Sequence, residues 1–232
     1  MRESAEPEKI TVSINDRDSV TAMLYLAAKK DRAGITLLLG HGAGGNQMSS
    51  FMRMFASGIA DRGFDAMTFN FLYSEQGRGA PDPKAKLEFC YRSVIEAALS
   101  LKKLKTNHLI VGGKSMGGRI ASQVAAADGS KISGLVFLGY PLHPPGKPEQ
   151  LRDAHLKDIR APMLFVQGSR DAFGTPDELR AVIKRDRLPA TFCEIGGGDH
   201  SFKVPKSAPL SQPEVYEMIM DKTADWARSK LA

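Results

Sequence analysis

The chain has 232 residues, of which 42% are hydrophobic and 25% are charged, as in an average soluble globular domain. This composition excludes an intrinsically disordered chain, a collagen-like fibre and a small scaffold held together by disulfides. The formal net charge is +6, but the basic residues are spread along the chain, mostly on expected helix faces, and no recognised binding motif accompanies them. We therefore expect no nucleic acid among the partners of this protein.

The two cysteines, Cys90 and Cys193, are too few for a disulfide framework or for a metal site of their own. The N-terminal residues are charged and lack the apolar run of a signal peptide. No stretch of the chain approaches the ~20 continuous apolar residues that a membrane-spanning helix needs. We therefore expect a cytoplasmic protein without a membrane span, and the sequence leaves its oligomeric state open.

Strands and helices are expected to alternate along the chain. Residues 10–14 and 20–27 are rich in β-forming residues and are joined by a polar turn, which predicts an antiparallel hairpin. Short apolar runs predict further strands at 35–39, 66–71, 108–111, 135–138, 163–166 and 191–195. Apolar residues at helical spacing predict helices over 48–62, 87–104, 120–127, 176–187 and 213–230.

This alternation indicates an α/β fold with a mostly parallel sheet that is covered by helices on both faces. The chain contains no internal repeat and no long linker, so one domain over residues 1–232 is expected. Two connections, 72–85 and 140–160, are irregular and longer than usual. Because long loops in compact domains are commonly functional, we expect them to form the walls of a binding site.

The motif Gly-Lys-Ser-Met-Gly at 113–117 is the strongest chemical signal in the sequence. It follows an apolar strand and precedes a helix, which is the context of a nucleophile elbow. There a sharp turn holds the serine in a strained conformation, and the flanking glycines let neighbouring backbone approach. Ser115 is therefore the predicted nucleophile. The alternative is a glycine-rich turn with an incidental serine.

A nucleophilic serine needs a general base, and the base needs an acid that orients it. Asp171 and His200 follow Ser115 in the order of such triads, each just past a predicted parallel strand. The carboxyl ends of parallel strands are where open α/β sheets bind ligands. We predict that Ser115 attacks, that His200 acts as base and then acid, and that Asp171 orients the imidazole.

Other acids and histidines near these positions are expected to have structural roles. Asp199 directly precedes His200, and the side chains of neighbouring residues diverge, so Asp199 is expected to hold a turn. Asp177 and Glu178 lie at a predicted helix N-terminus, where acids stabilise the helix dipole. His143, in the proline-rich connection, is a candidate substrate contact.

A second glycine-rich segment, His-Gly-Ala-Gly-Gly at 41–45, follows the strand at 35–39. Acyl transfer needs about two preorganised N–H groups that stabilise the tetrahedral oxyanion. The predicted donors are the amides of Met116 and Ala43, and Gly42 and Gly44 are expected to lie against the substrate.

The same glycines allow a competing interpretation as a dinucleotide-binding loop. That fingerprint needs a third glycine at position 47 and an acid near the end of the next strand. The chain has Gln47 there and the sequence Phe-Asn-Phe at 69–71, so this interpretation is rejected.

Lys114 occupies a position that is more often apolar or aromatic in a nucleophile elbow. A structural ion pair with a buried carboxylate is the favoured interpretation, and attraction of an acidic substrate is the alternative. The expected apolar contacts of the substrate are Phe71, Tyr73, Met116, Tyr140, Leu142 and Phe202.

Together these motifs resemble the α/β-hydrolase superfamily over nearly the whole chain. The segments 113–119 and 139–146 look like those of the small dienelactone-hydrolase-related group that includes the testis-expressed-protein type. The resemblance implies three layers around an eight-stranded sheet whose second strand is antiparallel, little or no cap, and no metal or organic cofactor. A dienelactone hydrolase itself would carry a cysteine nucleophile, so Ser115 argues against that reaction.

The function predicted from these residues is a serine hydrolase that cleaves a small or medium acyl ester or thioester through an acyl-enzyme. The expected partner is therefore a small acyl substrate. The resemblance implies little about its identity, because this fold hosts many chemistries. Two alternatives stay open, a catalytically silent interaction module and an acyltransferase.

Overall fold

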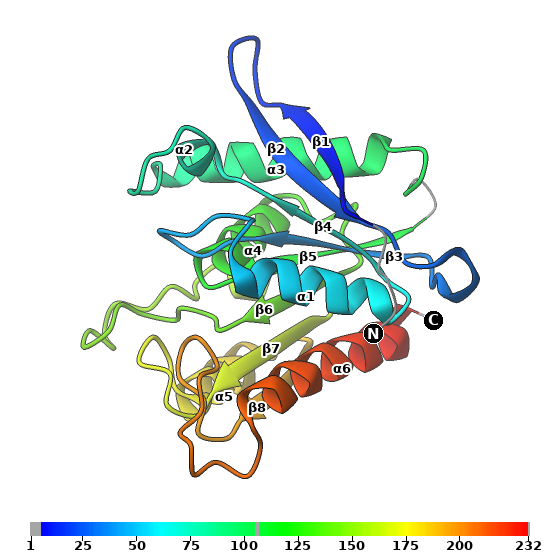
Figure 1. Cartoon of the computed structure of the whole chain (residues 1–232). Helices are drawn as coiled ribbons and strands as arrows, with labels where there is room; N and C mark the ends of the chain where they lie inside the picture. The colour runs from blue at the N-terminus through cyan, green and yellow to red at the C-terminus, as the bar shows by residue number, and fades with distance from the viewer. Residues whose placement is uncertain (1–5, 105–106, 232) are drawn as a thin grey trace.

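A mixed eight-stranded sheet forms the centre of the molecule (Figure 1). The computed structural model describes residues 6–104 and 107–231, so residues 1–5, on which the absence of a signal peptide was partly argued, lie outside the described residues. The strand order is β1-β2-β4-β3-β5-β6-β7-β8. The pairs β1–β2 and β2–β4 are antiparallel and all others are parallel. The strands are β1 (Glu8–Ser13), β2 (Ser19–Tyr25), β3 (Ile35–Gly40), β4 (Asp65–Phe69), β5 (His108–Lys114), β6 (Gly134–Leu138), β7 (Met163–Gly168) and β8 (Ala190–Ile195).

Helices cover both faces of the sheet, which gives the three layers expected from the sequence. The helices are α1 (Ser50–Asp61), α2 (Leu72–Glu75), α3 (Lys84–Ser100), α4 (Met116–Ala127), α5 (Pro176–Asp186) and α6 (Gln212–Leu231). One apolar core lies under α1 and α6, and the other lies under α3, α4 and α5 (Figure 1).

The alternation of side chains along β3 shows how the two cores are divided. Leu37 and Leu39 point to the face covered by α1 and α6, whereas Leu38 points to the face covered by α3 and α4. All six residues of β3 are buried. The apolar run of β3, which only Thr36 interrupts, is thus explained by burial on both faces.

Several elements begin or end at other residues than predicted, because apolar periodicity does not define their ends. Helix α4 begins at Met116, whereas the sequence predicted a start at residue 120. The two glycines in its first turn interrupt the apolar spacing from which the start was predicted. Helix α3 ends at Ser100, although Leu104 is buried beyond it. The connection at 72–85, expected to be irregular, begins with the short helix α2.

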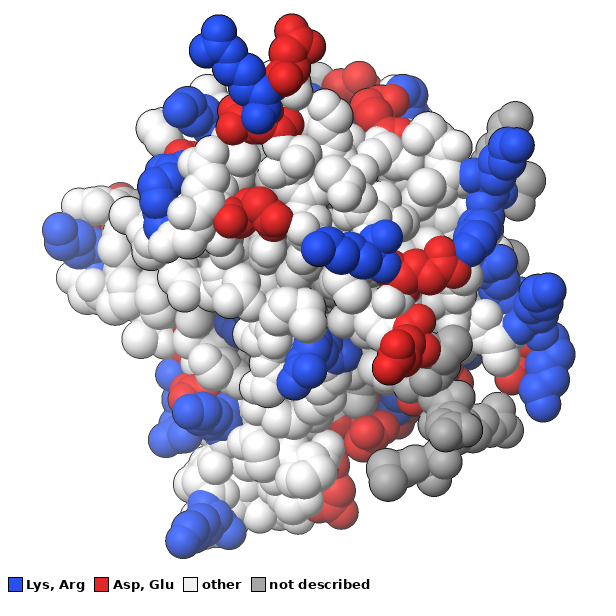
Figure 2. Space-filling model, turned by 45° about the horizontal axis from the view of Figure 1, so that its top comes forward, with Lys and Arg blue, Asp and Glu red and all other residues white. Residues whose placement is uncertain are grey.

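The carboxyl edge of the sheet carries no helical cap between β6 and β7, a connection that the structure describes throughout. This connection contains only the 3₁₀ turn η2 (Leu156–Asp158). Among the described residues, no helix is both long and apolar enough to cross a bilayer. On the face drawn in Figure 2, acidic and basic side chains are interspersed and do not gather into one charged patch.

Candidate active site

Ser115 lies at a sharp turn between β5 and α4. Its backbone has φ 50° and ψ −115°, outside the regions that residues with a side chain ordinarily occupy. A constraint of this kind persists only where the surrounding structure holds it. The serine hydroxyl is thereby presented beyond the end of the sheet.

Three glycines allow this turn to pack against the neighbouring strand. The register of the parallel pair β3–β5 sets Gly40 opposite Gly113. A Cβ atom on Gly113 or on Gly117 would overlap the carbonyl group of Gly40. The glycines of the motif are therefore required by a close backbone approach.

Tyr91 of α3 supports the strands just before this turn. Its hydroxyl lies 2.9 Å from the Leu38 carbonyl oxygen and 2.7 Å from that of Gly112, and it accepts from the Gly112 amide at 3.0 Å. The ring is fully buried. The sequence presents Tyr91 only as one apolar position of a helix, so this bridge between β3 and β5 was not predicted.

His200 and Asp171 lie beside Ser115 and form a continuous hydrogen-bonded chain with it. The His200 Nε2 atom is 2.8 Å from Ser115 Oγ, and His200 Nδ1 is 2.8 Å from Asp171 Oδ2. Because a carboxylate only accepts, Nδ1 carries the proton, and Nε2 is left to accept from the serine hydroxyl. The structure thus brings together three residues that are separated by 85 and 29 positions along the chain.

The Asp171 carboxylate is fully buried, and three donors hold it in place. Besides His200, the Gln167 side chain donates to Oδ2 at 2.8 Å and the Phe173 amide donates to Oδ1 at 2.8 Å. The Phe173 ring also packs on the imidazole, with ring centroids 4.2 Å apart. A buried carboxylate with these partners is kept in one orientation.

The role of Gln167 was not predicted from the sequence and is given by its hydrogen bonds in the structure. Its amide nitrogen donates to Asp171 and to the Gly174 carbonyl oxygen, while its oxygen accepts from the Tyr140 amide at 2.8 Å. It therefore links the ends of β6 and β7. The available signal was a single polar residue at the end of the apolar strand β7.

The glycine loop at 41–45 is anchored by His41, which is buried. The Phe71 amide donates to His41 Nε2 at 3.2 Å, so Nδ1 carries the proton and donates to the Gly42 carbonyl oxygen at 2.8 Å. Burial lowers the pKa of His41, in keeping with a neutral ring. Because the peptide is planar and trans, the Ala43 N–H points away from the His41 ring.

Two amides are available beside Ser115. Met116 is the first residue of α4, so its N–H has no carbonyl partner within the helix. Among the described residues, no acceptor is bonded to the Ala43 amide. Gly42, which precedes Ala43, lies so close to Ser115 that a Cβ added to it would be 3.6 Å from the Ser115 Cβ.

Lys114 does not form the ion pair that the sequence favoured. Its ammonium group donates to the His200 carbonyl oxygen at 2.5 Å, and no carboxylate of the described residues lies within ion-pair distance of it. Burial lowers the pKa of Lys114 to about 8, against the opposing effect of the more distant Asp171 and Asp199. Lys114 thus links the elbow to the histidine loop.

The structure places several predicted substrate contacts in the core instead. Tyr140 and Leu142 are 1% and 0% exposed, and the Tyr140 hydroxyl donates to the Arg152 carbonyl oxygen at 2.8 Å. His143 is buried as well, between the Pro144 carbonyl oxygen and the Glu178 carboxylate. The same holds for the three fully buried aromatic residues Phe71, Tyr73 and Phe202.

Two structural assignments are confirmed. The Asp199 carboxylate accepts from the amides of Ser201 and Lys203, which fixes the turn after His200. Glu178 forms a capping box with Thr175 at the start of α5.

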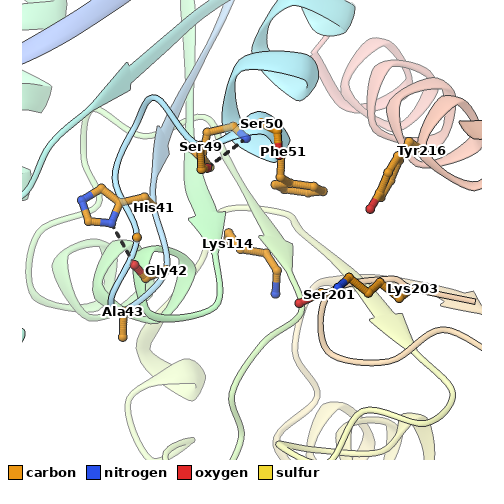
Figure 3. Close-up of a pocket in the computed structure, with 12 residues that line it drawn as sticks. His41, Gly42, Ala43, Ser49, Ser50, Phe51, Lys114, Ser201, Lys203 and Tyr216 are labelled. Atoms are coloured by element: carbon orange, nitrogen blue, oxygen red, sulfur yellow. Dashed lines mark hydrogen bonds between the residues drawn. The ribbon is translucent and has the colours of Figure 1, made fainter. Parts of the chain in front are cut away.

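A cavity of about 280 Å³ lies on the other flank of the site, between the glycine loop, α1 and α6 (Figure 3). Its wall contains the predicted substrate contacts Gly42 and Lys114 and the predicted oxyanion donor Ala43, but Gly44 does not line it. Ser115 and His200 lie beside it, since their chain neighbours Lys114 and Ser201 line it. The full lining is His41, Gly42, Ala43, Gly45, Ser49, Ser50, Phe51, Met52, Lys114, Ser201, Lys203 and Tyr216.

Comparison with solved structures shows the same fold in several proteins. The chain superposes on the dienelactone hydrolase from Anabaena variabilis with a TM-score of 0.75 at 16% identity, covering 98% of this chain and 100% of that one. It is also similar to XC6422 from Xanthomonas campestris, described as a serine hydrolase without lid (TM-score 0.73, 17% identity, 97% and 95% covered). An esterase domain from Rhodothermus marinus matches with a TM-score of 0.73 at 14% identity, with 98% and 100% covered.

A family model agrees with the fold. The model of an alpha/beta hydrolase domain matches residues 33–228, which include the elbow, the glycine loop and the loop that carries His200. The antiparallel hairpin β1–β2 precedes the matched region. On the match over most of the chain, this protein belongs to the α/β-hydrolase family.

Proposed function

We propose that this protein is a serine hydrolase that cleaves a small or medium acyl ester or thioester through a covalent acyl-enzyme. The observation that carries the proposal is the unbroken chain of hydrogen bonds from Asp171 through His200 to Ser115, with 2.8 Å at each step. The proton positions that this chain requires are those of a nucleophile next to a general base.

In the first half-reaction Ser115 Oγ attacks the acyl carbonyl carbon, and its proton passes to His200 Nε2. The negative charge that develops on the carbonyl oxygen is stabilised by the amides of Met116 and Ala43. The Asp171 carboxylate stabilises the imidazolium and holds its tautomer. Collapse of the intermediate breaks the bond to the alcohol or thiol, which leaves with the proton from His200.

In the second half-reaction a water molecule replaces the alcohol. His200 takes a proton from this water as it attacks the acyl-serine ester, and it returns the proton to Ser115 Oγ as the acid leaves. The uncapped edge of the sheet between β6 and β7 supports access of small substrates and water to this position.

Labelling with a fluorophosphonate probe and turnover of p-nitrophenyl acetate and butyrate test the proposal. The native protein is expected to be labelled and to show a burst of p-nitrophenolate, and Ser115→Ala to lose the label and at least about 10⁴-fold in kcat/KM. Ser130→Ala, an exposed serine bonded to Asp128, is the matched control and should behave like the native protein.

A native protein that is neither labelled nor active on any ester would favour the silent interaction module instead. Transfer of the acyl group to an added alcohol faster than to water would favour an acyltransferase. Analysis of the acyl products separates these outcomes.

A further inference from the structure

The charged side chains that line the cavity beside the triad are all basic. Lys114 and Lys203 are the ionised residues in its wall, and they extend into it from opposite sides (Figure 3). No aspartate or glutamate of residues 6–104 and 107–231 lines it. The 12-residue helix α1, whose first residue Ser50 lines the cavity, has no acidic residue in its first turn and adds the positive end of a helix dipole.

Neither ammonium group forms an ion pair with a carboxylate of the described residues. Lys114 donates to a neutral carbonyl oxygen, and Lys203 has no ion pair within the described part of the chain. The carboxylates closest to the cavity are already engaged. Asp171 is bonded to His200, and Asp199 accepts from the backbone amides of the turn that follows it.

A buried cation without a counter-ion is costly, and an anion that enters the site offsets that cost. Lys114 has three N–H donors and uses one on the His200 carbonyl oxygen. The ammonium group also lies over the Phe202 ring, 5.4 Å from its centroid, and its other two donors have no hydrogen-bond acceptor among the described residues. Because Lys114 directly precedes the nucleophile, a group bound there is close to the reacting centre.

The rest of the wall is suited to a carbon chain. Phe51 and Tyr216 pack edge to face with centroids 5.9 Å apart, and Met52 adjoins them. An occupant with an anionic end and a short aliphatic part matches both features. A carboxylate fits the two lysines, because an ammonium group recognises it as a point charge that needs no bidentate geometry.

We propose that this cavity binds the carboxylate end of the acyl group, so that the preferred substrates are hemiesters of dicarboxylic acids. This inference rests on the proposed serine hydrolase function and specifies its substrate class. Lys114 and Lys203 hold the distal carboxylate, and the aliphatic part lies along Phe51 and Tyr216 while the ester carbonyl reaches Ser115.

The experiment compares mono-p-nitrophenyl adipate with its neutral methyl ester, which differ only in the distal charge. The native protein is expected to favour the hemiester by about tenfold or more in kcat/KM, the range of a charge-assisted hydrogen bond. Lys114→Met should remove most of this preference, and Lys203→Gln, which changes an exposed lysine, should reduce it by up to about fivefold. Lys206→Gln, an exposed lysine of the same connection outside the cavity, should leave both substrates unchanged.

A preference near unity in the native protein that neither variant changes would overturn the inference. Inhibition by inorganic phosphate without a preference for the hemiester would overturn the assignment of a carboxylate. Because the preference is a ratio between two esters, a general loss of activity in Lys114→Met does not imitate the predicted change.

A binding measurement separates this inference from the proposed function. Ser115→Ala is titrated with monomethyl adipate and with dimethyl adipate by calorimetry. Binding of the monomethyl ester that Lys203→Gln weakens supports the site even if no ester is hydrolysed. Equal or absent binding of both compounds overturns it, whether or not the probe labels Ser115.

Discussion

The two flanks of the candidate active site differ in how they use their side chains. On the flank formed by the connection at 140–160, Tyr140, Leu142, Leu156 and Ile159 point inward and are buried, and the Tyr140 hydroxyl bonds to backbone. On the flank formed by the glycine loop, α1 and α6, side chains leave a cavity that contains two lysines. A long connection with a buried apolar part therefore closes one side of the site, while the open side is built from five short segments of the chain.

The difference shows that loop length and apolar content do not identify a substrate wall. The proline-rich connection has no helix to pack on its outer side, so its apolar residues lower their free energy by joining the core under α3, α4 and α5. The opposite flank includes backbone of the glycine loop, which has little side-chain volume to fill the space.

The largest effect is expected on the open flank, from Ala43→Pro, which removes the amide proposed to stabilise the oxyanion. We expect kcat on p-nitrophenyl butyrate to fall by about 10²–10³-fold, the range found when one such donor is lost. Ala43→Gly keeps the amide and should retain activity within a few-fold. Equal losses in both variants, with unchanged circular dichroism, would exclude this role of the amide.

On the closed flank, Leu142→Ala should act on stability rather than on substrate binding. Leu142 is fully buried, so its truncation is expected to lower the free energy of unfolding by about 2–5 kcal/mol. Denaturant titration measures this loss, and KM for neutral esters measured well below the melting temperature should stay within about twofold. A marked rise in KM with little loss of stability would instead show that Leu142 contacts the substrate.

The smallest of these effects is the pH dependence contributed by His155, also in the closed connection. His155 Nε2 lies 2.7 Å from the buried Ser122 hydroxyl. Burial, with the nearby Lys84 and Arg119, lowers the pKa of His155 to about 4. The unfolded chain therefore binds a proton below pH 6.5 that the folded protein excludes until about pH 4, and stability is lost as the pH falls through this range.

The contribution of His155 is expected to reach up to about 3 kcal/mol at pH 4. His155→Gln should flatten the pH dependence of unfolding between pH 6.5 and 4. His108→Gln, an exposed histidine at the start of β5, is the control and should keep the native slope. An unchanged slope in His155→Gln would contradict the predicted linkage.

The elements that position the triad could be predicted because their signals are local. An apolar run followed by glycines marks the end of a buried strand, and the carboxyl ends of parallel strands share one edge, so Ser115, Asp171 and His200 were expected to meet there. The strained backbone of Ser115 and the close packing of Gly113 on Gly40 agree with the turn expected from the motif. The substrate contacts were not predictable in this way, since four of them were assigned from their position in long connections.

The sequence by itself determined the fold class, the order of strands and helices, and which sheet edge collects the polar residues, because each depends on patterns within a few residues of the chain. Only the tertiary structure decided that Gln167 holds Asp171, that Lys114 bonds to the His200 loop, and on which flank the cavity lies. Those outcomes depend on which side chains fill the space between elements distant in sequence, and packing across the sheet edge sets that.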